Sequence, residues 1–180
     1  MKVLDHLRIR IPADADEAFD GGLLIPVFHR WIQTRALSET LIDVTDYRHL
    51  ADGPGVLLVC HDAFYSVDPH PARRALLYTR RTAMAGAIED KIEAAYEAAK
   101  EACGRLEREP EFAGKLRFRK DEFEVSVNDR LLAPNTEATF QAISTPLRAA
   151  LDRRLGPGRY TISAIGEARD LFTVAVRAVP

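Results

Sequence analysis

The sequence lacks most of the short motifs that identify a chemistry. It contains no GxGxxG, GxxxxGKS/T, GxSxG, HExxH or CxxC, so nothing in it predicts a dinucleotide or phosphate loop, a hydrolase nucleophile or a zinc protease. The spacing of His61 and His70 matches no common metal motif. We therefore predict neither a metal site nor a cofactor.

Cysteine is also scarce. The 180 residues include two, Cys60 and Cys103, which allow one disulfide at most and exclude the cysteine framework of small secreted domains. Cys60 falls in an apolar strand pattern and Cys103 in a helical one, so both are expected to be buried thiols. The first twelve residues alternate charged and apolar types and lack the apolar core of a signal peptide. The expected location is the cytoplasm.

Long apolar runs and excess charge are missing as well. No segment approaches the roughly 20 apolar residues of a membrane span, and the net charge of −2 gives no reason to expect a membrane or a nucleic acid as partner. The one basic stripe, Lys115, Arg117 and Arg119, is followed by Glu122 and Glu124. We interpret it as one arm of a hairpin whose charges pair across the strands.

Alternating apolar residues and turn signals predict about eight strands. They are residues 7–11, 41–47, 55–68, 75–81, the two arms of a hairpin within 115–129, and the final hairpin of 159–165 and 170–179. The segment 55–68 is taken as one continuous strand, closed by the turn 69–74.

Helical spacing predicts three helices. The strongest pattern covers 83–107, where apolar residues recur every three or four positions. A second helix is expected after Asn135 or Thr136, either of which can cap it, and Pro146 should kink it or divide it. The segment 25–36 fits a short helix, although a strand remains open as an alternative.

These elements predict an α+β fold in a single domain spanning 1–180, with 1–82 and 83–180 as sub-halves. The sheet should be mostly antiparallel, curved and built from hairpins, with one long and one kinked helix packed on it.

Candidate chemistry centres on His61 and Asp62. On a continuous strand, neighbouring side chains point to opposite faces, so these two should not form a pair. The favoured interpretation of His61 is a core histidine; the alternative is a general acid or base. For Asp62 we expect an ion pair with Arg74, Arg80 or Arg81, and a functional carboxylate is the alternative.

Further candidates come from neighbouring segments. Asp43 and Tyr47 belong to a strand expected beside 55–68, so Asp43 is a candidate catalytic carboxylate and Tyr47 a ligand contact, as is Tyr65. His29 and Trp31 lie on the short helix and could form a lid over a ligand.

Three functions remain open. The first, slightly favoured because no catalytic motif occurs, is a soluble cytoplasmic binding or accessory protein. It would hold a small molecule between sheet and helices and assemble as a homodimer. The second is an enzyme of hydrolase or isomerase type that uses His61 with a nearby carboxylate. The third is an interaction module that binds a protein through the helix 83–107.

Overall fold

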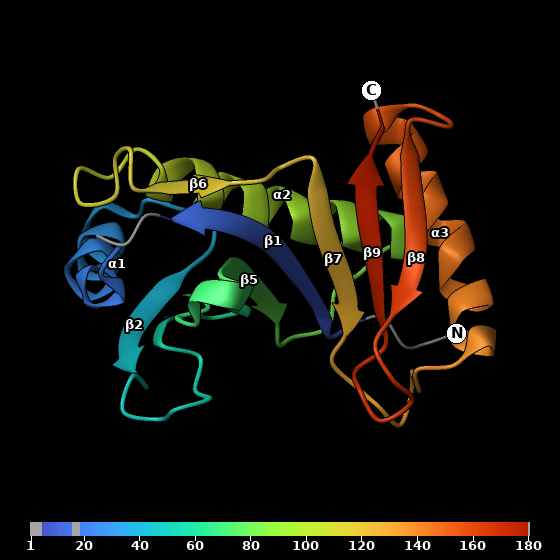
Figure 1. Cartoon of the computed structure of the whole chain (residues 1–180), viewed down its shortest axis with the longest axis horizontal. Coiled ribbons are helices and arrows are strands. Elements are labelled where there is room, and N and C mark those ends of the chain that lie inside the picture. Colours follow the sequence, from blue (N-terminus) through green and yellow to red (C-terminus); the bar gives the residue numbers. More distant parts are fainter. Residues whose placement is uncertain (1–4, 16–18, 180) are drawn as a thin grey trace.

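The computed structural model describes residues 5–15 and 19–179 and shows an α+β fold (Figure 1). Nine strands form one open, curved antiparallel sheet. The strands are β1 (Leu7–Ala15), β2 (Leu41–Asp46), β3 (Val56–Cys60), β4 (Ala63–Val67), β5 (Ala75–Arg80), β6 (Leu116–Phe118), β7 (Glu122–Val127), β8 (Tyr160–Ile165) and β9 (Thr173–Ala178). The α-helices are α1 (Leu24–Thr34), α2 (Ile88–Leu106) and α3 (Glu137–Leu155). Within the described ranges, no helix is both long and apolar enough to cross a membrane.

The two predicted halves share this sheet. The strand order is β2-β3-β4-β5-β1-β7-β9-β8, so β1 lies between strands from the first and the second half of the chain. Its Arg8 is opposite Thr79 of β5 on one side and Ser126 of β7 on the other. Side chains far apart in the sequence therefore meet around β1.

Alternation along β1 separates the two faces of the sheet. Leu7, Ile9 and Ile11 are fully buried, whereas Arg8 and Arg10 are half-buried on the opposite face. The buried face carries α2, which packs on β1 and β5, and α3, which contacts α2 and β8 (Figure 1). Burying an aliphatic side chain of this size contributes about 1.5–3 kcal/mol, so this helix-covered face supplies most of the stability.

The three helices form where the sequence predicts them, although α2 begins at Ile88 and not at residue 83. The segment predicted at 25–36 is the helix α1, not a strand. In α2, Tyr96 packs on Phe123 of β7, with ring centroids 4.3 Å apart. Thr136 caps α3 by accepting a hydrogen bond from Thr139 N, as predicted. Pro146 lies inside α3 without dividing it.

The predicted continuous strand 55–68 is wrong. The chain reverses at His61 and Asp62, and β3 and β4 pair as a hairpin. Neither turn residue has a positive φ, so the usual Asn-Gly or Asp-Gly signal is absent. The neighbouring strands hold the turn instead: His61 N donates to Thr40 O (2.9 Å), and Arg81 N donates to Asp62 O (2.9 Å).

The predicted hairpin within 115–129 is also wrong. Both β6 and β7 pair with β1, along Ala13–Ala15 and Leu7–Arg10, with a shift of register between them. They are successive parts of one path along β1, not partners of each other. Alternation shows which face a side chain takes, but it does not show which strand is the partner.

Candidate functional site

His61 and Asp62 lie at the surface, and the prediction that they would not form a pair is wrong. The His61 side chain is 70% exposed, so the favoured interpretation as a core histidine is wrong. Because the two residues form a turn, their side chains meet, with His61 Nδ1 3.1 Å from Asp62 Oδ1. The expected ion pair of Asp62 is confirmed with Arg80, whose Nη2 is 3.6 Å away.

Asp62 is held as a carboxylate by its neighbours. A hydrogen bond from Thr82 Oγ1 (2.7 Å) is the largest cause that lowers its pKa, and His61 and Arg80 add to the effect. These contacts stabilise the charged form. A carboxylate arranged in this way supports a turn, and it has no raised pKa that would make it a proton donor near neutral pH.

The two candidates from the β2 segment, Asp43 and Tyr47, lie apart from His61 and Asp62. Asp43 is exposed on β2, opposite Val59, and its Oδ1 accepts a hydrogen bond from Val44 N (2.8 Å). Tyr47 follows β2 at its other end, where Tyr47 N donates to Gly55 O (2.8 Å). The structure therefore brings His61 and Asp62 together but does not bring Asp43 or Tyr47 to them.

The aromatic candidates are largely structural. Tyr65 is buried on the helix-covered face against Tyr78, with ring centroids 5.1 Å apart, and burial raises its pKa. Trp31 is 2% exposed, and its Nε1 donates to Glu109 Oε1 (2.5 Å). His29 is exposed on α1. These three residues do not line a common cleft.

A cleft between sheet and helices does occur beside the His61–Asp62 turn. It has a volume of about 470 Å³. Its lining consists of Ser38, Glu39, Tyr78, Arg80, Met84 and four residues of α2. Sequence reasoning missed Glu39, which lies in the connection between α1 and β2.

Glu39 is the most perturbed carboxyl group in this cleft. Its side chain is 13% exposed, Oε1 accepts a hydrogen bond from Tyr78 OH (2.9 Å), and Arg80 Nη1 is 3.7 Å away. Oε2 is buried and has no hydrogen-bond partner among the described residues. Burial is the largest cause that raises the pKa of Glu39, and burial next to Glu39 raises that of Cys60 to about 12.

A larger cleft occupies the face of the sheet opposite the helices. It holds about 600 Å³ and continues into a second hollow of about 300 Å³; Arg8, Arg10 and Glu124 line both. The register of the strands explains its composition. Arg8 lies opposite Thr79 and Ser126, so hydroxyl-bearing residues occupy the neighbouring positions on both strands.

Apolar side chains form one part of this cleft. Leu57, Phe64 and Leu77 belong to β3, β4 and β5, and each is half-buried. Charged groups also line its rim, namely Asp52, Asp68 and Arg73. A solvated face of an antiparallel sheet usually carries polar residues. An apolar wall beside two arginines is therefore a surface with both a charged and an apolar part.

Arg8 and Arg10 differ in how their charges are neutralised. Arg10 Nη1 pairs with Glu124 Oε1 (2.8 Å), and Nη2 donates to Arg73 O (2.8 Å). Arg8 makes no hydrogen bond or ion pair with any side chain that the structure describes. Burial is the largest cause that lowers the pKa of Arg8, followed by repulsion from Arg10. Glu124 and Asp68 attract Arg8 at longer range. An arginine remains charged in proteins, so Arg8 is a partly desolvated cation that makes no direct hydrogen bond or ion pair with a described side chain.

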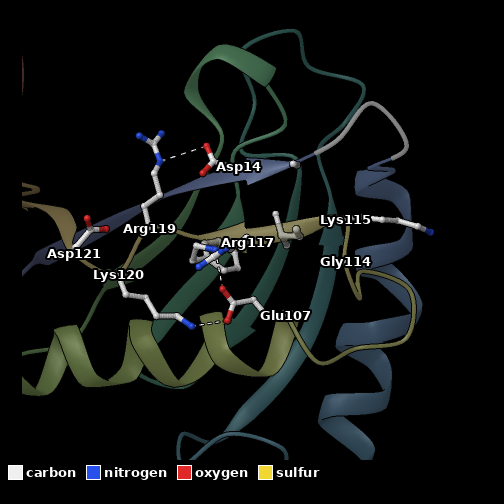
Figure 2. Close-up of a pocket in the computed structure, with 11 residues that line it drawn as sticks. Asp14, Glu107, Gly114, Lys115, Arg117, Arg119, Lys120 and Asp121 are labelled. Atoms are coloured by element: carbon white, nitrogen blue, oxygen red, sulfur yellow. Dashed lines mark hydrogen bonds and ion pairs between the residues drawn. The ribbon is translucent and has the colours of Figure 1, made fainter.

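A third hollow, of about 990 Å³, lies beside β6 and contains many charges. Figure 2 shows Lys120 directed toward Glu107 and Arg119 toward Asp14; the nitrogen–oxygen distances are 2.5 and 3.5 Å. Glu107 Oε1 also accepts a hydrogen bond from Phe118 N (2.8 Å). The contacts of Glu107 fasten β6 and the residues after it to the end of α2, and the Arg119–Asp14 pair fastens them to β1, which is a structural role.

Neither a family model nor a curated protein sequence matches this chain. The candidate site therefore depends on geometry. The alternation of Arg8 and Arg10 with buried residues was visible in the sequence, but their convergence with Phe64 and Leu77 required the strand order.

Proposed function

We propose that this protein is a binding protein that holds a small amphipathic anion on the helix-free face of its sheet. The anion is a carboxylate or a phosphate monoester with an apolar tail. The observation that carries the proposal is Arg8, a half-buried guanidinium that Glu124 and Asp68 attract only at longer range and that no described side chain contacts through a hydrogen bond or ion pair. A buried charge is costly unless it is paired, and a bound anion would supply a direct partner for the Arg8 guanidinium.

The surroundings of Arg8 support an anionic head group. A guanidinium binds carboxylate or phosphate oxygens through two parallel hydrogen bonds, and the hydroxyls of Thr79 and Ser126 lie on the neighbouring strands. Arg10 is already engaged by Glu124. The guanidinium N–H groups that remain available to a ligand in the middle of the cleft are therefore those of Arg8.

The apolar part of the cleft supports a tail. Leu57, Phe64 and Leu77 are on the same face as Arg8, and a tail placed on them removes apolar surface from water. The combined volume of the two hollows is in the range of ligand pockets, which runs from about 300 to 1,000 Å³.

The proposal includes assembly as a homodimer and a cytoplasmic location. Cys60 and Cys103 are both buried and not joined in a disulfide, which agrees with a compartment that keeps thiols reduced. It does not include binding through α2, because the apolar stripe of that helix is buried in its own chain.

Calorimetry with octanoate tests the function, with octanamide as a neutral ligand of the same shape. We expect the wild-type chain to bind octanoate but not octanamide. Arg8→Gln should weaken octanoate binding about tenfold or more, since a charge-assisted hydrogen bond contributes about 1.5–3 kcal/mol. Arg117→Gln is the matched control, because Arg117 is exposed on β6 outside the cleft. Equal binding by Arg8→Gln and wild type would disprove the proposal.

A second candidate, an enzyme, has one observation in its favour. Glu39 has a raised pKa and faces a cleft together with Tyr78 and Arg80, which are groups suited to general acid–base chemistry. Incubation with a cell-metabolite extract would reveal turnover by wild type that Glu39→Gln lacks. If both proteins leave the extract unchanged, this candidate fails.

A further inference from the structure

The two edges of the sheet differ in how their outward backbone groups are occupied. In an antiparallel ladder, alternate residues direct N–H and C=O toward the partner strand, and those between direct them away. At β2, Tyr47 N donates to Gly55 O, so Val44 and Asp46 are the residues whose backbone groups point outward. The outward N–H of Val44 donates to Asp43 Oδ1 (2.8 Å).

The β2 edge is therefore protected against pairing. Asp43 occupies an outward donor, Asp43 and Asp46 place negative charge along the strand, and the register is interrupted between Leu41 and Asp43. Charged side chains and irregular register are the devices by which natural sheets prevent edge-to-edge association.

The β8 edge has none of these devices. Val179 N donates to Arg159 O (2.8 Å), which makes Tyr160, Ile162 and Ala164 the residues whose backbone groups point outward. The strand reads YTISAI, with neither charge nor proline, and its pairing with β9 is regular throughout. The structure describes no side-chain hydrogen bond to these three outward amides.

Apolar side chains are exposed at one end of this edge. Leu131 and Leu132, in the loop between β7 and α3, are 95% and 55% exposed. The loop is tied to the end of β8, because Asn135 Nδ2 donates to Ile165 O (3.2 Å) and Glu167 O (2.9 Å). Figure 1 shows this loop beside the β8–β9 turn. Exposed apolar groups next to an unprotected strand mark an interaction surface.

We infer that β8 pairs with β8 of a second copy of this chain and joins two sheets into one. The occupant is a second copy because the edge is neutral and complementary to itself. When all three outward residues pair with one another, Ile162 lies on the two-fold axis and Thr161 faces Ser163 of the second copy. A two-fold contact of this kind is closed, so it yields dimers and not filaments.

This inference rests on the homodimer of the proposed function and identifies β8 as the strand through which the two copies associate. Light scattering on the full chain, across a dilution series, should give twice the 20.1 kDa chain mass. Ala164→Pro should give the mass of one chain, because it removes an outward donor and no bond to β9. Val44→Pro, the matched change on the protected edge, should leave the dimer intact.

A charge exchange tests the pairing without proline. Thr161 and Ser163 are exposed, so T161K/S163K and T161E/S163E should both fold. Each should be monomeric alone because like charges face each other, and a mixture of the two should recover the doubled mass. A monomeric wild type, filaments, or a dimer that survives every β8 variant would overturn the inference. The monomeric variants should bind octanoate as tightly as wild type does. A failure of the dimer inference can therefore be distinguished from a failure of the proposed ligand site.

Discussion

Leu57 and Leu58 are neighbours of the same type on β3, yet they meet different surroundings. Leu58 is fully buried on the helix-covered face, whereas Leu57 is half-buried and lines the cleft on the other face. One face is closed by helices and holds the fold together. The other face leaves apolar groups and the Arg8 cation at a surface that no described helix covers. Such a surface contributes little to the stability of the fold and is available to bind a ligand.

Truncating these two leucines should show the largest contrast. We expect Leu58→Ala to lower the free energy of unfolding by about 3 kcal/mol, because it leaves a cavity in a packed core. Leu57→Ala should lower it by about 1 kcal/mol, since the cleft already exposes this side chain to water. Denaturant unfolding of both variants measures the difference, and equal losses would show that the cleft face is packed like the core.

The two arginines of the cleft sharpen the contrast within one face. Arg10→Leu should destabilise the protein by about 1–2 kcal/mol, because Glu124 is left without its partner. Arg8→Leu should stabilise the ligand-free protein by about 1 kcal/mol, since it removes a partly desolvated charge that forms no direct ion pair with a described side chain. Thermal unfolding without ligand distinguishes them. Destabilisation by Arg8→Leu would mean that Arg8 supports the fold.

Glu39 should give a smaller effect that depends on pH. Its pKa is raised by burial, so the folded state binds the proton more tightly than the unfolded state. Stability therefore decreases as pH rises from the unfolded pKa of about 4.5 through the folded pKa, and then stays level. Glu39→Gln should be more stable than wild type at pH 7 by about 0.5–1 kcal/mol, about 1–4 °C in Tm. The difference should vanish at pH 4, and a difference that persists there would contradict this assignment.

The smallest change in stability should come from His61, the main candidate of the sequence analysis. His61→Ala should change the free energy of unfolding by no more than about 0.5 kcal/mol, as exposed substitutions usually do. Asp62→Asn should lower the free energy of unfolding mainly at pH values above the pKa of Asp62, because the charged carboxylate stabilises the folded wild type there. Urea titration at pH 7 measures both. A large loss in His61→Ala would indicate that the turn is formed by His61 itself.

Prediction succeeded where the signal is local. The apolar stripe of α2, the Thr136 cap and the alternation of Leu7, Ile9 and Ile11 each reflect a periodicity that one segment carries by itself. The prediction failed at the His61–Asp62 turn because the sequence there has no typical turn signal. Backbone hydrogen bonds to Thr40 and Arg81, which lie next to β2 and β5, hold the turn instead. The prediction missed Glu39 for the same reason, since the burial that raises its pKa comes from elements distant in the chain.

The sequence alone determined that this chain forms an antiparallel α+β fold, where most strands and helices lie, and which residues of β1 share a face. These properties follow from backbone geometry and hydrophobic periodicity, which act over a few residues. The tertiary structure decided that β6 and β7 both pair with β1, that Arg8 shares a cleft with Phe64 and Leu77 without a direct ion pair to a described side chain, and that β8 keeps an open edge. Strand partners and desolvation depend on the packing of the whole chain, so no local pattern contains them.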